Sequence, residues 1–206
     1  MLVSTALITI NILPVYKNFS DALRLSAFQV SSIITTTGYA TADFNLWPQF
    51  SKSILLILML VGACAGSTGG GLKVSRAVML VKMIGKELRY LLHPRSVNSV
   101  RFEGKHVDGA TIKSVSSYFA VYIFCMVAIF LVLSLEPAPF DMETNMSAAI
   151  CCFNNIGPAF GVAGPMGSFA GYSPLSKIIL SLAMLMGRLE IYPLLLTLSP
   201  ATWIKK

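Results

Sequence analysis

Apolar residues in this chain fall into blocks of two lengths. Residues 112–135 form a block long enough to cross a bilayer, for which a helix needs about 20 apolar residues. The blocks at residues 1–13, 54–65 and 142–153 are much shorter, and at a rise of about 1.5 Å per residue they do not reach across. The pattern predicts an all-α membrane protein in which some helices enter the bilayer only part of the way.

An uncharged, hydroxyl-rich segment at residues 35–41, Thr-Thr-Thr-Gly-Tyr-Ala-Thr, follows one of these short helices. The helix is predicted to be capped by Ser20 or Asp21 and to end near Ile34. Extended backbone is tolerated at membrane depth only where protein or a water-filled cavity surrounds it. Carbonyl oxygens pointed into such a cavity can replace the water shell of a potassium ion. We call residues 35–41 the first ribbon; a threonine-rich turn of a soluble protein is the alternative, and the apolar flanks count against it.

The apolar run at residues 54–65 ends in a glycine-rich sequence, Gly66-Ser67-Thr68-Gly69-Gly70-Gly71, which we call the glycine segment. A run of this length ends near the middle of the membrane. Glycine lowers helix preference by about 1 kcal/mol relative to alanine, so an unwound intramembrane loop is predicted. A close helix-packing surface of small residues is the alternative. A nucleotide-binding P-loop is rejected, because Lys73-Val74 does not supply the required Lys-Ser/Thr pair.

Residues 72–92 change to an amphipathic helical pattern that ends at His93-Pro94. Such a helix leaves the membrane or lies along its surface. Residues 93–110 are predicted to form a polar cytoplasmic connection. The chain is thereby divided into a first pore unit at residues 1–92, this connection, and a second pore unit at residues 111–206.

The second unit repeats the plan of the first. Ser51-Lys52, Met59-Leu60 and Gly62 recur 125 positions later as Ser176-Lys177, Met184-Leu185 and Gly187. A helix at residues 142–153, capped by Asp141, precedes a second ribbon at residues 154–161, which stands where the threonine segment stood. A parallel repeat implies rotation about the membrane normal, which is the arrangement of a pore.

The second unit contains two charged residues, Arg188 and Glu190, inside an otherwise apolar helix. A charged side chain in mid-membrane is costly, so Arg188 is predicted to face the pore, where it would slow or gate cations. The alternative is a structural role in which Arg188 and Glu190 each have a separate partner. Pro193 is predicted to kink this helix, and Trp203 is predicted to anchor its cytoplasmic end.

Composition supports a membrane protein: 55% of residues are hydrophobic, 12% are charged, and the mean hydropathy is +0.71. The net charge is +7, and nine of the sixteen Lys and Arg residues lie between Lys73 and Lys113. This asymmetry places residues 73–113 in the cytoplasm, beside anionic lipid headgroups. A nucleic-acid partner is not expected. The two histidines and four cysteines lack metal-ligand spacing, and no catalytic set is visible, so an enzyme is not expected either.

Five motifs together resemble the Trk/Ktr/HKT superfamily of potassium-uptake proteins, and most closely its bacterial TrkH branch. They are Ser-x-x-Thr-Thr-Thr-Gly-Tyr-Ala-Thr at residues 32–41, Gly-x-Cys-x-Gly-Ser-Thr-Gly-Gly-Gly-x-Lys at residues 62–73, His93-Pro94-Arg95, Asn155-Ile156-Gly157-Pro158, and Gly187-Arg188-Leu189-Glu190. The resemblance implies four helix–pore loop–helix units around one pseudo-fourfold pore. It also implies homodimers in the inner (cytoplasmic) membrane, regulated by a cytoplasmic nucleotide-binding subunit.

Carried onto this chain, the resemblance implies pore units three and four, half of such a pore. Its potassium filter would comprise Thr36, Thr37, Gly38, Tyr39, Asn155, Ile156, Gly157 and Pro158, with potassium bound at Thr37, Gly38, Ile156 and Gly157. Its gate would comprise Gly66, Ser67, Thr68, Gly69, Gly70, Gly71 and Arg188. No organic cofactor is implied.

Two departures from the family pattern affect this expectation. Ala159 stands where the family has a glycine, and alanine is strained if the position requires a positive φ. Two of the four units are also absent, so we expect either a truncated chain, in which residues 1–13 are the outer end of a longer helix, or assembly of two copies. A broken-helix secondary cation transporter and a non-conducting membrane interaction module are the alternative functions.

Overall fold

The computed structural model describes residues 1–62, 69–93, 101–102, 105–136, 140–189, 191–198 and 200–203. These residues form α-helices, short 3-10 helices and one two-stranded antiparallel sheet. In chain order the elements are α1 (Leu2–Tyr16), α2 (Phe19–Ile34), η1 (Phe44–Leu46), α3 (Gln49–Leu60), α4 (Val74–Leu92), β1 (Arg101–Phe102), β2 (Lys105–His106), α5 (Gly109–Leu133), α6 (Met142–Asn154), η2 (Gly161–Ala163), η3 (Phe169–Gly171), α7 (Pro174–Arg188), α8 (Ile191–Leu198) and α9 (Pro200–Trp203).

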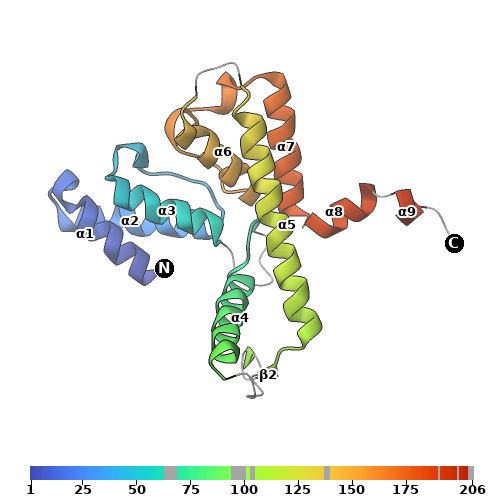
Figure 1. Cartoon of the computed structure of the whole chain (residues 1–206). Coiled ribbons are helices and arrows are strands. Elements are labelled where there is room, and N and C mark those ends of the chain that lie inside the picture. Colours follow the sequence, from blue (N-terminus) through green and yellow to red (C-terminus); the bar gives the residue numbers. More distant parts are fainter. Residues whose placement is uncertain are drawn as a thin grey trace.

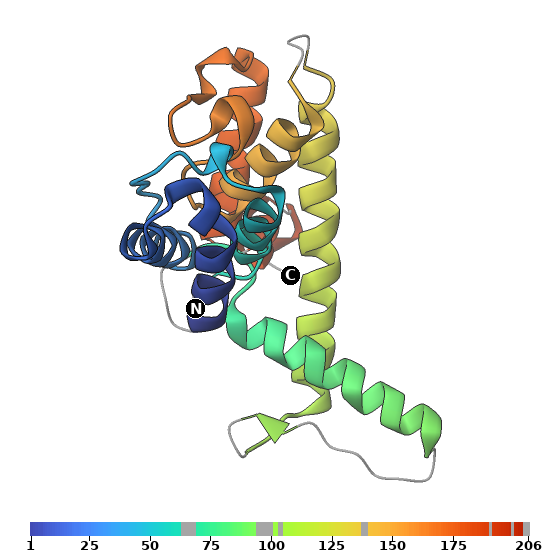
Figure 2. The same ribbon diagram turned by 90° about the vertical axis from the view of Figure 1, so that its left-hand side faces the viewer.

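The helices gather into two groups of three. Helices α1, α2 and α3 contact one another, and so do α5, α6 and α7 (Figure 1). Helix α3 of the first group also contacts α6 of the second. Figure 2 shows α5 as the long helix along one side of the molecule, with α4 crossing its lower part. The groups therefore meet along α3 and α6, the helices that flank the two ribbons.

Helix lengths agree with the hydrophobic blocks. Within the described residues, α5 is the one helix long and apolar enough to cross a membrane, while α1 and α3 are shorter apolar helices. Helix α4 is amphipathic as predicted, and none of its residues is buried. Its apolar residues, including Val81, Ile84 and Leu88, remain exposed in this chain.

One of two local predictions about helix ends is wrong. Helix α2 begins at Phe19, two or three residues earlier than a Ser20 or Asp21 cap would allow, because the Asn18 side chain accepts a hydrogen bond from the Ser20 N–H at 3.3 Å. The last long apolar block is broken at Leu189, between α7 and α8. This break lies four residues before Pro193, where a proline opposes a continuous helix, so it agrees with the predicted kink.

Helix α6 is the most enclosed element, although it carries many polar residues. Thr144, Asn145 and residues 147–154 are all buried. The polar side chains mostly have partners: the Ser147 hydroxyl accepts the N–H of Phe160 at 2.9 Å, and Asn145 accepts the hydroxyl of Tyr172 at 3.0 Å. Because buried polar groups are stabilising only when they are paired, these bonds fix α6 relative to the loops around it.

Candidate functional site

Both ribbons leave their helices through the same backbone turn. At the end of α2 the N–H of Thr37 donates to the Ser32 carbonyl at 2.9 Å, and at the end of α6 the N–H of Ile156 donates to the Cys151 carbonyl at 3.1 Å. The residue before each donor is left-handed, with φ of 54° at Thr36 and 55° at Asn155. This is the Schellman ending of a helix. Asn154 belongs to α6, so the second ribbon begins one residue later than predicted.

The glycines of the two ribbons lie against each other. Gly38 has φ of 80° and Gly157 has φ of 127°, a region that favours glycine. A Cβ added to Gly157 would lie 3.0 Å from the Cα of Gly38, and one added to Gly38 would overlap the carbonyl oxygen of Ile156. The two predicted filter glycines are therefore in direct contact, although they are far apart in the sequence.

The outer parts of both ribbons line one cavity of about 280 Å³. From the predicted filter it includes Gly38, Tyr39, Gly157 and Pro158. The remaining filter candidates Thr36, Thr37, Asn155 and Ile156 are not among its lining residues. The structure thus brings four of the eight predicted residues to one common cavity, whose lining residues are all uncharged.

A side chain from each preceding helix donates to a ribbon carbonyl. Ser32 Oγ donates to the Tyr39 oxygen at 2.6 Å, and Cys151 Sγ donates to the Gly157 oxygen at 2.8 Å. Neither side chain was predicted from the sequence to have this role. The signal was present, because each donor precedes its ribbon glycine by six residues. These bonds restrict rotation of the peptide planes that they reach.

Ala159 is not strained. It is absent from the described residues with positive φ, so the condition for strain at this position does not apply. Its side chain is fully buried, and its N–H donates to the Ala163 carbonyl at 2.9 Å. Alanine is therefore compatible with this ribbon, whose left-handed turns occur at Asn155, Gly157 and Gly161 instead.

The described part of the glycine segment is irregular and close-packed at once. Residues 69–71 are not helical, as an unwound loop requires, and Gly71 has φ of 83°. Gly70 and Gly71 also lie against the end of α6, because a Cβ added to Gly70 would be 2.6 Å from the Asn154 carbonyl oxygen. Gly66, Ser67 and Thr68 lie outside the described residues, so their place in a gate stays a prediction.

Arg188 is the last residue of α7, and its side chain is exposed. The preceding Gly187 is pressed against α6, where an added Cβ would overlap the Phe153 carbonyl oxygen. Both the glycine segment and the end of α7 therefore contact the last turn of α6. That Arg188 faces the glycine segment stays a prediction.

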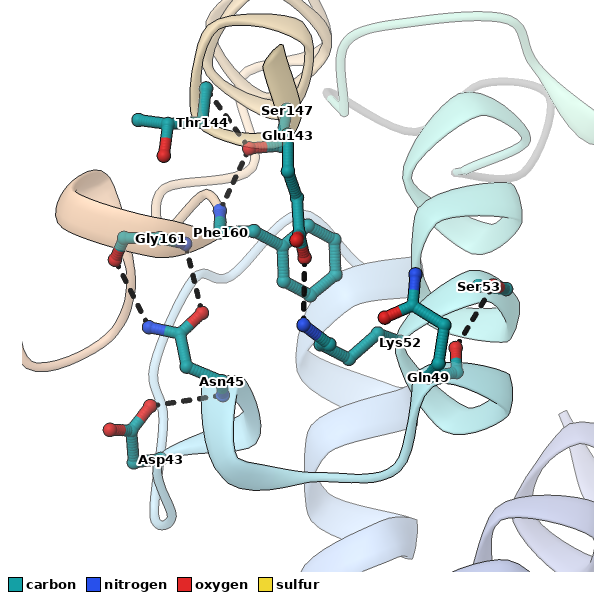
Figure 3. A network of polar contacts seen from close by, with 10 residues as sticks. All are labelled: Asp43, Asn45, Gln49, Lys52, Ser53, Glu143, Thr144, Ser147, Phe160 and Gly161. Atoms are coloured by element: carbon teal, nitrogen blue, oxygen red, sulfur yellow. Dashed lines mark hydrogen bonds and ion pairs between the residues drawn. The ribbon is translucent and has the colours of Figure 1, made fainter. Parts of the chain in front are cut away.

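A polar network joins α3 to α6 beside the ribbons (Figure 3). Lys52 of α3 forms an ion pair with Glu143 in the first turn of α6, with 2.8 Å between Nζ and Oε1. Phe44 packs edge-on against Phe160 of the second ribbon, with 5.3 Å between the ring centroids. These contacts fix the relative position of the two ribbons from the side.

Comparisons with known proteins identify relatives over nearly the whole chain. The family model described as TrkH, cation transport protein, matches residues 11–204. The Trk system potassium uptake protein TrkH of Salmonella typhimurium is 35% identical over 189 residues, which cover 92% of this chain and 38% of that protein. TrkG of Escherichia coli strain K12 is 35% identical over 178 residues, covering 86% of this chain and 36% of that protein.

A solved structure has the same fold. The crystal structure of the potassium transporter TrkH from Vibrio parahaemolyticus superposes with a TM-score of 0.88 at 33% sequence identity, covering 98% of this chain and 43% of that chain. The chain thus spans about two-fifths of the length of the relatives that it matches.

Proposed function

Since this chain belongs to the TrkH family of cation transport proteins, we propose that it supplies two of the strands that line a potassium pathway across the inner (cytoplasmic) membrane. The observation that carries the proposal is the contact between Gly38 and Gly157. Each glycine follows a half-length helix through the same left-handed turn. Two equivalent strands that meet in this way are half of a ring of carbonyl oxygens, and the two groups of helices are accordingly two parallel pore units.

Potassium would be held by main-chain oxygens in place of its water shell. The coordinating residues are Thr37 and Gly38 in the first ribbon and Ile156 and Gly157 in the second, with Thr36, Tyr39, Asn155 and Pro158 shaping the same strands. The C-terminal ends of α2 and α6 carry the partial negative charge of the helix dipole, which favours a cation beside each ribbon. Neutral, oxygen-rich lining suits a monovalent ion that must enter and leave quickly.

The gate of this pathway is the glycine segment, residues 66–71, together with Arg188. Its support is the position of Gly70 and Gly71 against the last turn of α6, directly behind the second ribbon. A loop without side chains can occupy a narrow passage and can move without repacking. A positive charge at Arg188 would add an electrostatic barrier to cations below the filter.

Closing the ring requires further strands, because two ribbons surround a pathway only in part. The TrkH relative from Salmonella typhimurium is about two and a half times as long as this chain, so further strands come from additional pore units or from a second copy. The basic helix α4 and the connection after it would lie at the cytoplasmic surface, next to anionic lipid. A homodimer and a nucleotide-binding regulatory subunit at this surface complete the proposed assembly.

The experiment measures potassium and sodium influx into proteoliposomes containing a chimera. In the chimera this chain replaces the matching segment of the Vibrio parahaemolyticus transporter, which supplies the rest of the pore. Gly38→Ser should lower the preference for potassium over sodium by roughly ten-fold, because a side chain there overlaps Ile156 and is strained at φ of 80°.

The matched control is Gly85→Ser in α4, where an added Cβ meets nothing within 4 Å. Its selectivity should equal that of the parent chimera. If Gly38→Ser keeps the parent preference in folded protein, the filter assignment is wrong. Deletion of residues 69–71 should raise flux, and an unchanged or lower rate in folded protein would count against the gate.

A further inference from the structure

Asn154 occupies an unusual position at the last residue of α6. Its side chain is 1% exposed, and its Oδ1 accepts a hydrogen bond from the Tyr122 hydroxyl of α5 at 2.8 Å. Its Nδ2 is buried and has no hydrogen-bond partner within the described residues. The carboxamide is thus held at one atom and left unsatisfied at the other, immediately before the second ribbon.

Residues 70–71 of the glycine segment lie directly on this carboxamide. A Cβ added to Gly71 would overlap Asn154 Oδ1 and would lie 3.2 Å from Asn154 Cβ, while one added to Gly70 would be 2.6 Å from the Asn154 main-chain oxygen. Any larger residue at these positions would be forced away from α6. Asn154 therefore forms the surface against which residues 70–71 rest.

Tyr122 is itself fixed by aromatic neighbours. Its ring lies 5.1 Å from that of Phe153 and 6.5 Å from that of Tyr118, centroid to centroid, and it is 1% exposed. The Arg76 guanidinium of α4 lies 4.0 Å from the centre of the Tyr118 ring. A continuous set of contacts thus joins α4, which follows the glycine segment, through α5 to Asn154.

We propose that Asn154, oriented by Tyr122, is a positioning residue that holds the glycine segment against the base of α6. The proposal rests on the proposed function, in which that segment is the gate. The unsatisfied Nδ2 destabilises the arrangement in which residues 70–71 rest on Asn154, because a buried donor without a partner is unfavourable. The donor would regain a hydrogen bond once water reached it. This lowers the free-energy difference between the held arrangement and a released one.

The test removes the orienting hydroxyl and leaves the ring. Tyr122→Phe should raise potassium flux through the chimera by roughly five-fold, the factor that corresponds to one neutral hydrogen bond. Selectivity for potassium over sodium should not change, because the ribbons keep their contacts.

A matched control exists at the opposite end of the same helix. Tyr172 donates to Asn145 Oδ1 at 3.0 Å, which is also a buried Tyr–Asn bond on α6, but it is remote from the glycine segment. Tyr172→Phe should leave flux unchanged. Hydrogen exchange of residues 69–73, followed by mass spectrometry, should speed up in Tyr122→Phe and not in Tyr172→Phe, and this measurement does not depend on transport.

The outcomes separate this proposal from the one on which it rests. If Tyr122→Phe and Tyr172→Phe change flux and exchange equally, or if neither does, Asn154 has no positioning role. The same conclusion follows if Tyr122→Phe still raises flux once residues 69–71 are deleted. If instead the parent chimera conducts no potassium, or Gly38→Ser leaves selectivity unchanged, the proposed function itself fails, and the exchange experiment still decides the role of Asn154.

Discussion

Asn45 binds the main chain of Gly161 at both of its polar groups. Its Oδ1 accepts the Gly161 N–H at 3.0 Å, and its Nδ2 donates to the Gly161 carbonyl at 3.1 Å (Figure 3). The two residues are 116 positions apart. A side chain that follows the first ribbon therefore holds the end of the second, and this clamp is the most direct polar link between the two ribbons.

Asn45→Ala is expected to destabilise the protein by about 2 kcal/mol, since each neutral hydrogen bond contributes about 1 kcal/mol. Asn45→Asp keeps the acceptor for the Gly161 N–H and loses the donor, so it should cost about half as much. Thermal unfolding in detergent measures both. Ser53→Ala is the control, because it removes a bond within one helix turn, from Ser53 Oγ to the Gln49 carbonyl. Equal losses in all three variants would show that Asn45 has no special role.

Thr36 and Asn155 are the left-handed residues at the ends of α2 and α6, and each can be replaced by the residue type found at the other position. Thr36 is β-branched, and a positive φ is costly for such a residue, whereas asparagine tolerates it. Thr36→Asn should therefore stabilise the fold by about 1 kcal/mol. Asn155→Thr should destabilise it by about 2 kcal/mol, because it adds that strain and removes the bond from Asn155 Nδ2 to the Met184 carbonyl at 2.9 Å.

Chemical unfolding of the two single variants measures this asymmetry. The control is the double exchange, Thr36→Asn with Asn155→Thr. Its change in the free energy of unfolding should equal the sum of the single effects, because the two residues have different hydrogen-bond partners. Equal and opposite single effects would indicate strain alone, without the Met184 bond. Destabilisation by Thr36→Asn would contradict the strain argument.

Two helical glycines differ in what surrounds them, and the same substitution should give opposite results. An added Cβ at Gly187 in α7 would overlap the Phe153 carbonyl oxygen, whereas one at Gly85 in α4 meets nothing within 4 Å. Gly187→Ala should destabilise the protein by about 1–3 kcal/mol through overpacking. Gly85→Ala should be neutral or stabilising by up to about 1 kcal/mol, the helix preference of alanine over glycine.

The measurement is the yield of monodisperse protein in detergent and its unfolding temperature. Because both variants add the same methyl group to a helix, a difference between them reports on packing against α6. If Gly187→Ala unfolds at the same temperature as Gly85→Ala, the end of α7 does not lie on α6 as described.

Hydrophobic block lengths and glycine positions predicted much of this fold. The short helices α2, α3 and α6, the long α5 and the amphipathic α4 follow from local patterns, since periodicity and run length are properties of neighbouring residues. The start of α2 was misplaced because Asn18 competes with Ser20 as a cap. The break before α8 lies four residues before Pro193, the place where a proline interrupts a helix, so it follows from the sequence.

The site was predicted less completely, for a physical reason. Gly38 could be named because it is the one glycine in an uncharged segment that follows a short helix, whereas Gly157 was named from the resemblance to the family. Asn154 and Asn45 could not be named, because their roles depend on contacts between segments that lie far apart in the sequence. Hydrogen bonds between distant segments produce no periodic pattern in the sequence. An asparagine that is buried in the fold therefore cannot be distinguished in the sequence from an asparagine in an exposed loop.

Glu136 follows α5 and lies outside the membrane-spanning segment. Its carboxylate accepts hydrogen bonds from the hydroxyl of Ser176 at the start of α7, and from the N–H and hydroxyl of Ser173 at 2.9 and 3.1 Å. The hydroxyl of Ser176 is the main cause that lowers the pKa of Glu136 below its ordinary value, with further contributions from Ser173 and from the charge of Lys177. These bonds join the outer ends of α5 and α7.

A lowered carboxyl pKa stabilises the fold at a pH above its unfolded value, near 4.3. This stabilisation is lost as the pH falls through the lower, folded pKa, because the neutral acid accepts these hydrogen bonds poorly. Glu136→Gln should therefore unfold at a lower temperature than the parent protein at pH 7. As the pH falls below about 4.3 the difference should shrink progressively, and it should be lost once the pH is below the lowered folded pKa, where the parent is also uncharged at this position.

Unfolding curves of both proteins across pH 3–8, taken in a detergent of constant charge, provide the measurement. The control is Glu143→Gln in the α3–α6 network, where the partner of the carboxylate is the Lys52 ammonium rather than a serine hydroxyl. A difference between parent and Glu136→Gln that stays constant down to pH 3 would mean that the Glu136 side chain acts through its shape rather than through its charge.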